Sequence, residues 1–220
     1  MNLVFVEFPK MARLTRECVI TEKIDGTNAQ VYIVTVPGDQ NLPEGWVDCR
    51  SLEGIDRQVM FAGSRNRYIS PKDDNFGFAT WVKAHADELW ALGDGRHYGE
   101  WWGSGIQRGY GLAEKRFSLF NVARWHRVGA EPYVSQGVDP RLPPKLSTEA
   151  PACCHVVPIL YRGLFGPKHD DNYLAKLQHE GSVASPGFMK PEGVVVYHVA
   201  AGVSFKKTLE KDEQPKGAGR

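Results

Sequence analysis

The sequence has few cysteines and almost no excess of charge of either sign. Its four cysteines among 220 residues form neither the regular framework of a small secreted domain nor two Cys-x-x-Cys pairs. The 27 lysines and arginines against 26 aspartates and glutamates give a formal net charge of +1. This balance excludes a chain that coats DNA through a uniform positive field, so any contact with nucleic acid must come from a local patch.

Long hydrophobic runs and a targeting segment are also missing. No stretch reaches the length needed to cross a bilayer, and the first residues show no basic region that leads into a long apolar run. Cys153-Cys154-His155 has no second pair of metal ligands, so we expect free thiols and no structural zinc there. These absences predict a reduced cytoplasmic setting, or the host cytoplasm for a viral protein, without membrane attachment.

The sequence contains instead a series of short strand patterns, which predict an antiparallel-rich α+β domain. Residues 18–36 read as a strand, a tight turn at Asp25-Gly26 and a second strand, and residues 75–92 read as one amphipathic helix. Residues 37–53 and the proline-rich stretch from Pro132 to Pro144 read as loops, and Gly103 to Gly111 as a flexible loop. The remaining predictions are strands at 59–64, 96–102, 117–125 and 155–165, a hairpin at 193–199 and 203–209, and a short helix at 171–181.

One segment has the residue types of a nucleophilic site. Glu22-Lys23-Ile24-Asp25-Gly26-Thr27-Asn28 puts Lys23 where a strand meets its turn. A lysine amine is a poor nucleophile while it is protonated, so a catalytic lysine needs a desolvated site or neighbouring cations. The competing interpretation is a surface lysine beside an ordinary Asp-Gly turn, and this segment alone does not decide between the two.

Further segments follow it in a set order along the chain. They are Ser64-Arg65, Tyr98-Gly99-Glu100-Trp101, Phe117-Ser118-Leu119-Phe120-Asn121, Glu192-Gly193-Val194-Val195-Val196 and Val203-Ser204-Phe205-Lys206-Lys207. With Lys-x-Asp-Gly-x-Asn at Lys23, this order over residues 20–208 resembles the covalent nucleotidyltransferase superfamily of polynucleotide ligases and capping enzymes. DNA ligases and capping enzymes usually have arginine where Asn28 stands, so the chain is most similar to ATP-dependent RNA ligases of the phage double-strand-sealing and RNA-editing types.

The resemblance implies a fold and a mechanism. Residues 1–209 would form a nucleotidyltransferase domain, the ATP-grasp-like adenylation domain of ligases, followed by a flexible charged tail at 210–220 and no separate OB-fold domain. Lys23 would take AMP from ATP, pass it to a 5′-phosphate RNA end, and a 3′-hydroxyl would then displace it, with Mg²⁺ or Mn²⁺ offsetting phosphate charge. RNA ends or a nicked duplex are the expected partners, and we expect a monomer.

The same resemblance assigns roles to residues beside the lysine and to two carboxylates. Glu192 would organise the hydrated metal ion or the lysine, and Glu100 would bind the ribose or the metal region, so both are candidate metal ligands. The alternative for each is an ordinary strand-end glutamate. Glu22, Ile24 and Asn28 flank Lys23 and are expected to help bind the nucleotide.

The remaining candidates are an arginine, an aromatic ring and two lysines. Arg65 would grip phosphate or ribose through its fork-shaped guanidinium, or else lie in a solvated basic turn. Phe120 would stack on adenine or pack in the core. Lys206 and Lys207 are neighbours on a strand, so only one should face the nucleotide, and we choose Lys206.

The last of these segments departs from the family pattern, which usually has two lysines two positions apart on one strand face. Ser204 takes the place of the first lysine, so either Lys207 bends in or another cation such as Lys190 substitutes. Two other functional classes stay open, and this departure bears on the second of them. One is a DNA nick ligase or GTP-dependent capping enzyme, against which Asn28 and the lack of room for an OB-fold domain after residue 208 argue. The other is a catalytically silent nucleic-acid-binding relative, which a test for a covalent nucleotide would separate from an enzyme.

Overall fold

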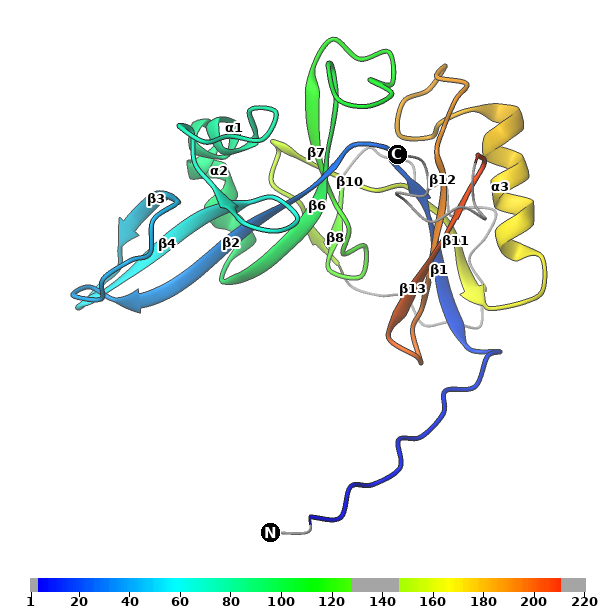
Figure 1. The fold of residues 1–220 in the computed structure, drawn as a ribbon, viewed down its shortest axis with the longest axis horizontal. Helices are drawn as coiled ribbons and strands as arrows, with labels where there is room; N and C mark the ends of the chain where they lie inside the picture. Colours follow the sequence, from blue (N-terminus) through cyan, green and yellow to red (C-terminus); the bar gives the residue numbers. More distant parts are fainter. Residues whose placement is uncertain (1–3, 128–146, 211–220) are drawn as a thin grey trace, which may run out of the picture.

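The computed structural model describes residues 4–127 and 147–210. The predicted proline-rich loop from Pro132 to Pro144, and residues 211–220 of the predicted tail, lie outside the described residues. Two sheets lie side by side, each with a helical layer on one face, and the N-terminal segment projects away from both (Figure 1). This strand-rich α+β architecture with mainly antiparallel pairing confirms the predicted fold class at that level.

The smaller sheet, which we call the small sheet, is covered on one face by helix α3 (His169–Glu180). Cys18, Ile20 and Val194 are buried against Leu177 of this helix. Acidic residues occupy the first turn of α3, where the helix dipole favours negative charge, and Gly181 ends it. The strands of the small sheet run in the order β11 (Ile159–Leu164), β1 (Glu17–Lys23), β12 (Gly193–His198) and β13 (Val203–Thr208).

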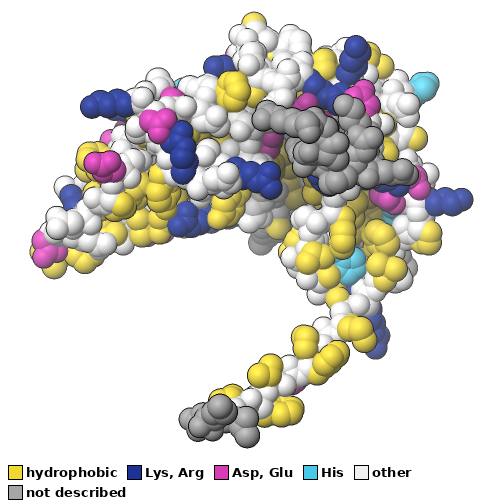
Figure 2. Space-filling view, viewed as in Figure 1, with side chains coloured by type: hydrophobic (Ala, Val, Ile, Leu, Met, Phe, Trp, Pro, Cys, Tyr) yellow, Lys and Arg dark blue, Asp and Glu magenta, His cyan; other side chains and the backbone are white. Residues whose placement is uncertain are grey.

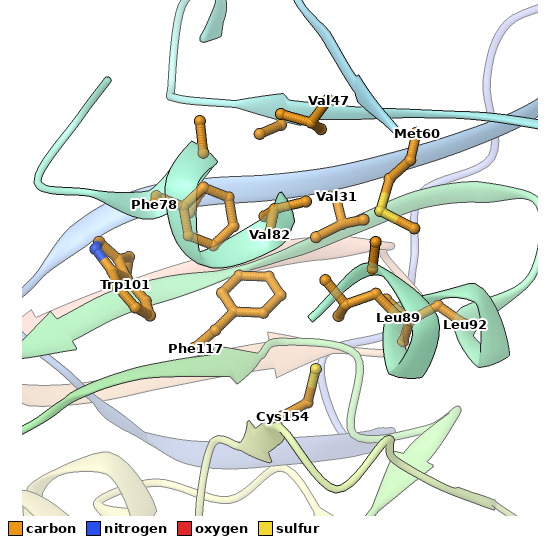
Figure 3. Packing of buried hydrophobic residues seen from close by; sticks show 14 of the residues in the cluster. Val31, Val47, Met60, Phe78, Val82, Leu89, Leu92, Trp101, Phe117 and Cys154 are labelled. Atoms are coloured by element: carbon orange, nitrogen blue, oxygen red, sulfur yellow. The ribbon is translucent and has the colours of Figure 1, made fainter. Parts of the chain in front are cut away.

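The larger sheet, which we call the large sheet, packs one face against α1 (Phe78–Ala84) and α2 (Ala86–Leu89). Figure 3 shows Val31 and Met60 of the sheet pointing toward the helices among closely packed buried side chains. Fully burying each large apolar side chain contributes roughly 1.5–3 kcal/mol. The strands run in the order β10 (Cys154–Val156), β7 (Lys115–Leu119), β6 (Gly95–Gly103), β2 (Thr27–Pro37), β4 (Asp56–Gly63) and β3 (Trp46–Ser51), and β5 (Tyr68–Ile69) also pairs with β4.

A few short elements complete the described fold. A 3-10 turn, η1 (Trp90–Leu92), follows α2, and β8 (Trp125–His126) pairs in parallel with β9 (Thr148–Glu149). Within residues 4–127 and 147–210, no helix combines the length and apolar composition that crossing a membrane would require.

The chain crosses between the two sheets at two neighbouring places. It leaves the small sheet at the end of β1 and enters the large sheet with β2, and it returns between β10 and β11. The crossings touch, because the backbone N–H of Glu22 donates to the carbonyl of Pro158 at 3.0 Å. Residues 18–36 form a strand, a turn and a second strand as predicted, but β1 and β2 belong to different sheets and do not pair with each other. Lys23 therefore lies at the junction between the two sheets.

The first crossing leaves no space for a side chain at Gly26. A Cβ added there would lie 2.4 Å from the carbonyl oxygen of Trp101 and 2.7 Å from the Cβ of Trp102. Only glycine lets the connection between β1 and β2 pass this close to β6.

Other predicted elements differ at specific residues. The helix predicted over 75–92 is interrupted at His85, whose φ of −113° and ψ of 19° are not helical. The strand predicted over 155–165 is divided at Pro158, because proline has no N–H for the sheet ladder. The strand predicted over 117–125 ends at Leu119, after which the Asn121 side chain accepts the backbone N–H of Arg124 and forms a turn.

The region predicted as a loop over 37–53 contains β3, which pairs with β4. By contrast, the hairpin predicted at 193–199 and 203–209 is confirmed by the antiparallel pairing of β12 with β13. The short helix predicted at 171–181 is also confirmed, as the later part of α3.

Candidate active site

A cavity of about 950 Å³ lies between the two sheets. Thr21 and Val195 line it from the small sheet, and Tyr98 and Leu119 line it from the large sheet. Figure 2 shows the molecule hollowed below its centre, between the halves that these sheets occupy in Figure 1. The volume is near the upper end of the roughly 300–1,000 Å³ range of small-molecule sites.

The Lys23 side chain lies in this cavity beside a buried carboxylate. Its Nζ donates a hydrogen bond to Oε2 of Glu192 at 2.5 Å, and the two side chains are 18% and 10% exposed. The pairing follows from strand register, because Lys23 at the end of β1 lies opposite Gly193 at the start of β12. Separating such a poorly solvated pair would leave an uncompensated charge. The end of β1 therefore presents an amine in a fixed orientation.

Glu100 faces the same cavity from the large sheet. It accepts hydrogen bonds from the backbone N–H of Gly26 at 3.1 Å and from the side-chain amide of Asn28 at 3.2 Å. Asn28 lies directly opposite it on β2. Burial raises the pKa of Glu100 to about 7, and the nearby Lys23 cation only partly counteracts this. Its carboxyl group can therefore gain or lose a proton near neutral pH.

The Glu22 carboxylate anchors the strand that carries the lysine. Glu22 is 1% exposed and accepts hydrogen bonds from the Ser182 hydroxyl at 2.6 Å and from the backbone N–H groups of Val183 and Ala184 at 2.8 Å each. Burial raises the pKa of this carboxyl, while the three donors favour its ionised form. Glu22 borders the cavity, but its oxygens are used by the protein itself.

The turn after β1 is held from outside by the loop between β6 and β7. The backbone N–H of Asp25 donates to the Tyr110 hydroxyl at 2.9 Å, and Nε of Arg108 donates to Oδ2 of Asp25 at 3.0 Å. Arg108 also donates to the carbonyl of Lys190 at 3.1 Å and lies 3.6 Å from the Glu210 carboxylate. Tyr110 is buried, which raises the pKa of its hydroxyl. This loop, predicted to be flexible, is packed against the turn.

Phe120 and Ile24 occupy different environments. Phe120 is 41% exposed on the cavity wall, and its backbone N–H donates to the carbonyl of Tyr98 at 3.0 Å. The core interpretation of Phe120 is therefore wrong. Ile24 borders the cavity but is buried in a cluster with Trp102 and Tyr110, so it also fixes the backbone beside Lys23.

The two lysines of β13 separate to opposite faces, as the strand alternation predicts. Lys206 and Ser204 line the cavity. Lys207 instead pairs with Asp170 at 3.0 Å and with Asp171 at 2.5 Å, both on α3. Lys207 therefore does not bend into the cavity.

Arg65 lies away from the residues that line the cavity. It is exposed in the turn between β4 and β5, where the backbone N–H of Ser64 donates to the carbonyl of Arg67 at 2.9 Å. The role of Arg65 in binding phosphate or ribose stays a prediction. The predicted residues that the structure does bring together at the cavity are Glu22, Lys23, Ile24, Asn28, Glu100, Phe120, Glu192 and Lys206.

The stretch that contains all of these residues matches a known family. The model of the family described as RNA ligase matches residues 16–208. The chain belongs to the RNA ligase family. No curated protein sequence matches it.

The fold of this chain is similar to that of solved structures of Naegleria gruberi RNA ligase. An arginine-to-alanine variant of that ligase with ATP and Mn matches with a TM-score of 0.51 and 18% identity, over 89% of this chain and 50% of that chain. A lysine-to-alanine variant with ATP and Mn matches with a TM-score of 0.50 and the same identity and coverage. The likeness shows the fold, and the chain spans about half the length of these ligases.

Sequence analysis missed the residues that hold the site of this RNA ligase family member in place. Ser182 anchors Glu22 across 160 sequence positions, and Tyr110 holds Asp25 across 85. Neither belongs to a motif, because each role depends on a contact between distant segments. The signal that could have indicated Tyr110 is that it is an aromatic residue within the glycine-rich run from Gly103 to Gly111.

Proposed function

We propose that the two-sheet domain is a nucleotidyltransferase that takes AMP from ATP onto Lys23, transfers it to a 5′-phosphate RNA end and seals that end to a 3′-hydroxyl. The observation that carries the proposal is the Lys23 amine, paired with Glu192 in the wall of a cavity that Glu100 borders from the other sheet. Membership of the RNA ligase family and the fold likeness to a ligase solved with ATP and Mn support it.

Lys23 would act as the nucleophile. Once its ammonium group has lost a proton, the nitrogen lone pair forms a bond to the α-phosphorus of ATP, and the bond from that phosphorus to the bridging oxygen breaks as pyrophosphate leaves. An oxygen of the RNA 5′-phosphate then displaces the lysine, which regains a proton. The 3′-hydroxyl finally attacks the RNA phosphorus, loses its proton and releases AMP. The hydrogen bond to Glu192 would keep the Lys23 nitrogen aimed at the phosphorus.

The two buried carboxylates fit a hydrated divalent cation. Mg²⁺ is usually held by one or two carboxylates together with substrate phosphates and water, and Mn²⁺ accepts the same oxygen ligands. Glu100 and Glu192 would hold the ion here, and when bound it would offset negative charge on the phosphates. Lys206 would add positive charge from β13, and Phe120 would offer a flat ring to adenine.

The proposal is tested by measuring the intact mass of the protein after incubation with ATP and Mg²⁺. Any AMP already attached is first removed with pyrophosphate and Mg²⁺, which reverse the first step. We expect a mass increase equal to one AMP with ATP, none with GTP and none in Lys23→Ala. The matched control is Lys83→Ala on α1, which removes a lysine on the helical side of the large sheet and should gain AMP normally.

An increase with GTP alone would favour a capping-type enzyme. No increase with either nucleotide, in protein whose circular dichroism shows it folded, would contradict the proposed function and favour a binding relative. Sealing needs its own test, because the chain spans about half the length of the similar ligases. If the adduct forms, RNA with a 5′-phosphate and RNA with a 3′-hydroxyl are added, and the joined product is measured.

A further inference from the structure

The large sheet has one face packed by helices and one face that borders the cavity. On the helical face, Val31, Ile33 and Met60 are buried. On the other face, Tyr32 and Phe61 belong to a separate cluster of strand and loop residues. No helix among the described residues contributes to that cluster, and Arg96 and Tyr98 of β6 are exposed.

Strand register places aromatic and cationic side chains together on the face that borders the cavity. Arg96 and Tyr98 precede Glu100 at alternate positions of β6. Tyr98 lies opposite Gln30 of β2, and Arg96 lies opposite Tyr32. Residues at alternate positions of a strand share a face, so these side chains continue the row that begins at Glu100. Figure 2 shows hydrophobic side chains interspersed with lysine and arginine along the lower margin of the half that contains β2, β4 and β6.

The guanidinium group of Arg96 is held over the face of an aromatic ring. Its Cζ lies 3.9 Å from the centroid of the Tyr32 ring. Its two terminal nitrogens donate to Oε1 of Gln30 at 3.1 Å and to the hydroxyl of Tyr68 at 3.2 Å. Arg96 is nevertheless exposed, so one side of the flat group rests on Tyr32 while the rest is available to a ligand.

The positive charge of Arg96 is not neutralised by these contacts. Gln30 and Tyr68 are uncharged, and no described carboxylate forms a salt bridge with Arg96. Tyr98 beside it is 54% exposed, and both residues also line the cavity. An unneutralised guanidinium and an exposed ring are thus continuous with the site that contains Lys23.

We propose that Tyr98, Arg96 and Tyr32, which we call the Arg96 platform, bind the unpaired RNA segment next to the end that is joined. Single-stranded RNA is bound by stacking its bases on aromatic rings and guanidinium planes over a sheet, while cations contact its phosphates. A fixed, flat guanidinium suits this role because little side-chain freedom is lost on binding. The inference rests on the proposed function, since it concerns the RNA that reaches Lys23.

The test measures the affinity of the purified chain for a short single-stranded RNA with a 5′-phosphate, over a range of salt concentrations. Tyr98→Leu should weaken binding by about 5-fold or more, the effect of losing one base stack, and Tyr98→Phe should restore it. Arg96→Gln should also weaken binding and reduce the salt slope by about 1, as for one lost phosphate contact. Arg96→Lys should recover the salt slope but not the full affinity, because ammonium does not stack as a plane.

Two further variants complete the design. Lys83→Gln removes a cation from α1, on the opposite face of the sheet, and should change neither affinity nor salt slope. Tyr32→Leu removes the ring beneath Arg96, so RNA affinity should fall because the guanidinium group is no longer held in one orientation. Thermal unfolding midpoints close to the wild type verify that the variants fold.

Unchanged RNA affinity in both Tyr98→Leu and Arg96→Gln would overturn the inference. Failure of the wild-type chain to bind single-stranded RNA, or binding of duplex RNA alone, would overturn it as well. Failure of the proposed function has a different signature, which is the absence of an AMP adduct whatever the RNA affinity.

Discussion

The small sheet and the large sheet contribute different chemical groups to one cavity. The small sheet provides Lys23 and Lys206 and adjoins Glu192, the charged groups that we propose act at phosphorus. The large sheet provides Glu100, and the exposed ring of Phe120 directly follows its strand β7; we propose that both recognise the nucleotide. Each sheet is packed on its other face by helices, so the groups that face the cavity are held in place by a core behind them.

This difference predicts how substitutions should behave. Changes in the small sheet should lower the rate at which AMP is attached. Changes in the large sheet should act mainly on binding or on the protonation of Glu100.

Glu192→Gln should slow adenylate formation by at least about 100-fold, because a misplaced nucleophile alone can cost that much. The substitution removes the charge that fixes the Lys23 nitrogen and one of the two carboxylates proposed for the metal ion. The measurement is the single-turnover rate of AMP transfer from labelled ATP. A decrease of less than about tenfold would show that Glu192 does not orient the nucleophile.

Lys206→Gln should slow the same step by about 10- to 100-fold, since it removes a cation near developing phosphate charge. Lys207→Gln is the matched comparison, because this neighbour pairs with α3. We expect Lys207→Gln to change the rate by less than about threefold and the free energy of unfolding by about 1 kcal/mol or less, as for a largely solvated ion pair. Equal rate effects would contradict the separation of the two lysines to opposite faces.

Arg108→Ala tests the contacts that join the two sheets around the lysine turn. Arg108 touches Asp25, the carbonyl of Lys190 and Glu210, so its loss should loosen the segments beside Lys23, Glu192 and Lys206 together. We expect kcat for adenylate formation to fall by about tenfold with KM for ATP nearly unchanged, and Arg108→Lys to recover part of the rate. A rise in KM alone would indicate direct nucleotide binding by Arg108.

Glu100 should make folding stability depend on pH. Its pKa is raised by burial from 4.5 to about 7, so the folded protein holds a proton that the unfolded chain has released between these pH values. The free energy of unfolding should therefore decrease as pH rises through this window, by up to about 3 kcal/mol from this group. Urea unfolding at about pH 5 and about pH 8 should show a smaller decrease in Glu100→Gln than in the wild type. Identical decreases would contradict the raised pKa.

The sequence predicted the directions of side chains along a strand better than the way in which the two sheets are joined. Alternation along a strand correctly separated Lys206 from Lys207, because side-chain direction is a local property. Local patterns also located the strands on either side of Asp25-Gly26, but an Asp-Gly turn is typical of hairpins, whereas here the chain crosses from one sheet to the other. The contacts of Ser182 and Arg108 depend on that crossing, so no local pattern indicated them.

The two touching crossings also join the two sheets at a single place beside Lys23. Glu22 is bonded to Pro158 at this point, and Gly26 has no space for even one methyl group. A rocking motion of one sheet against the other would therefore pivot beside Lys23, as hinges confine backbone change to a few residues. Tyr98 and Tyr197, on opposite walls of the cavity, would move apart while the amine and Glu192 kept their distance. In such a motion the entrance would widen while the nucleophile stayed in place.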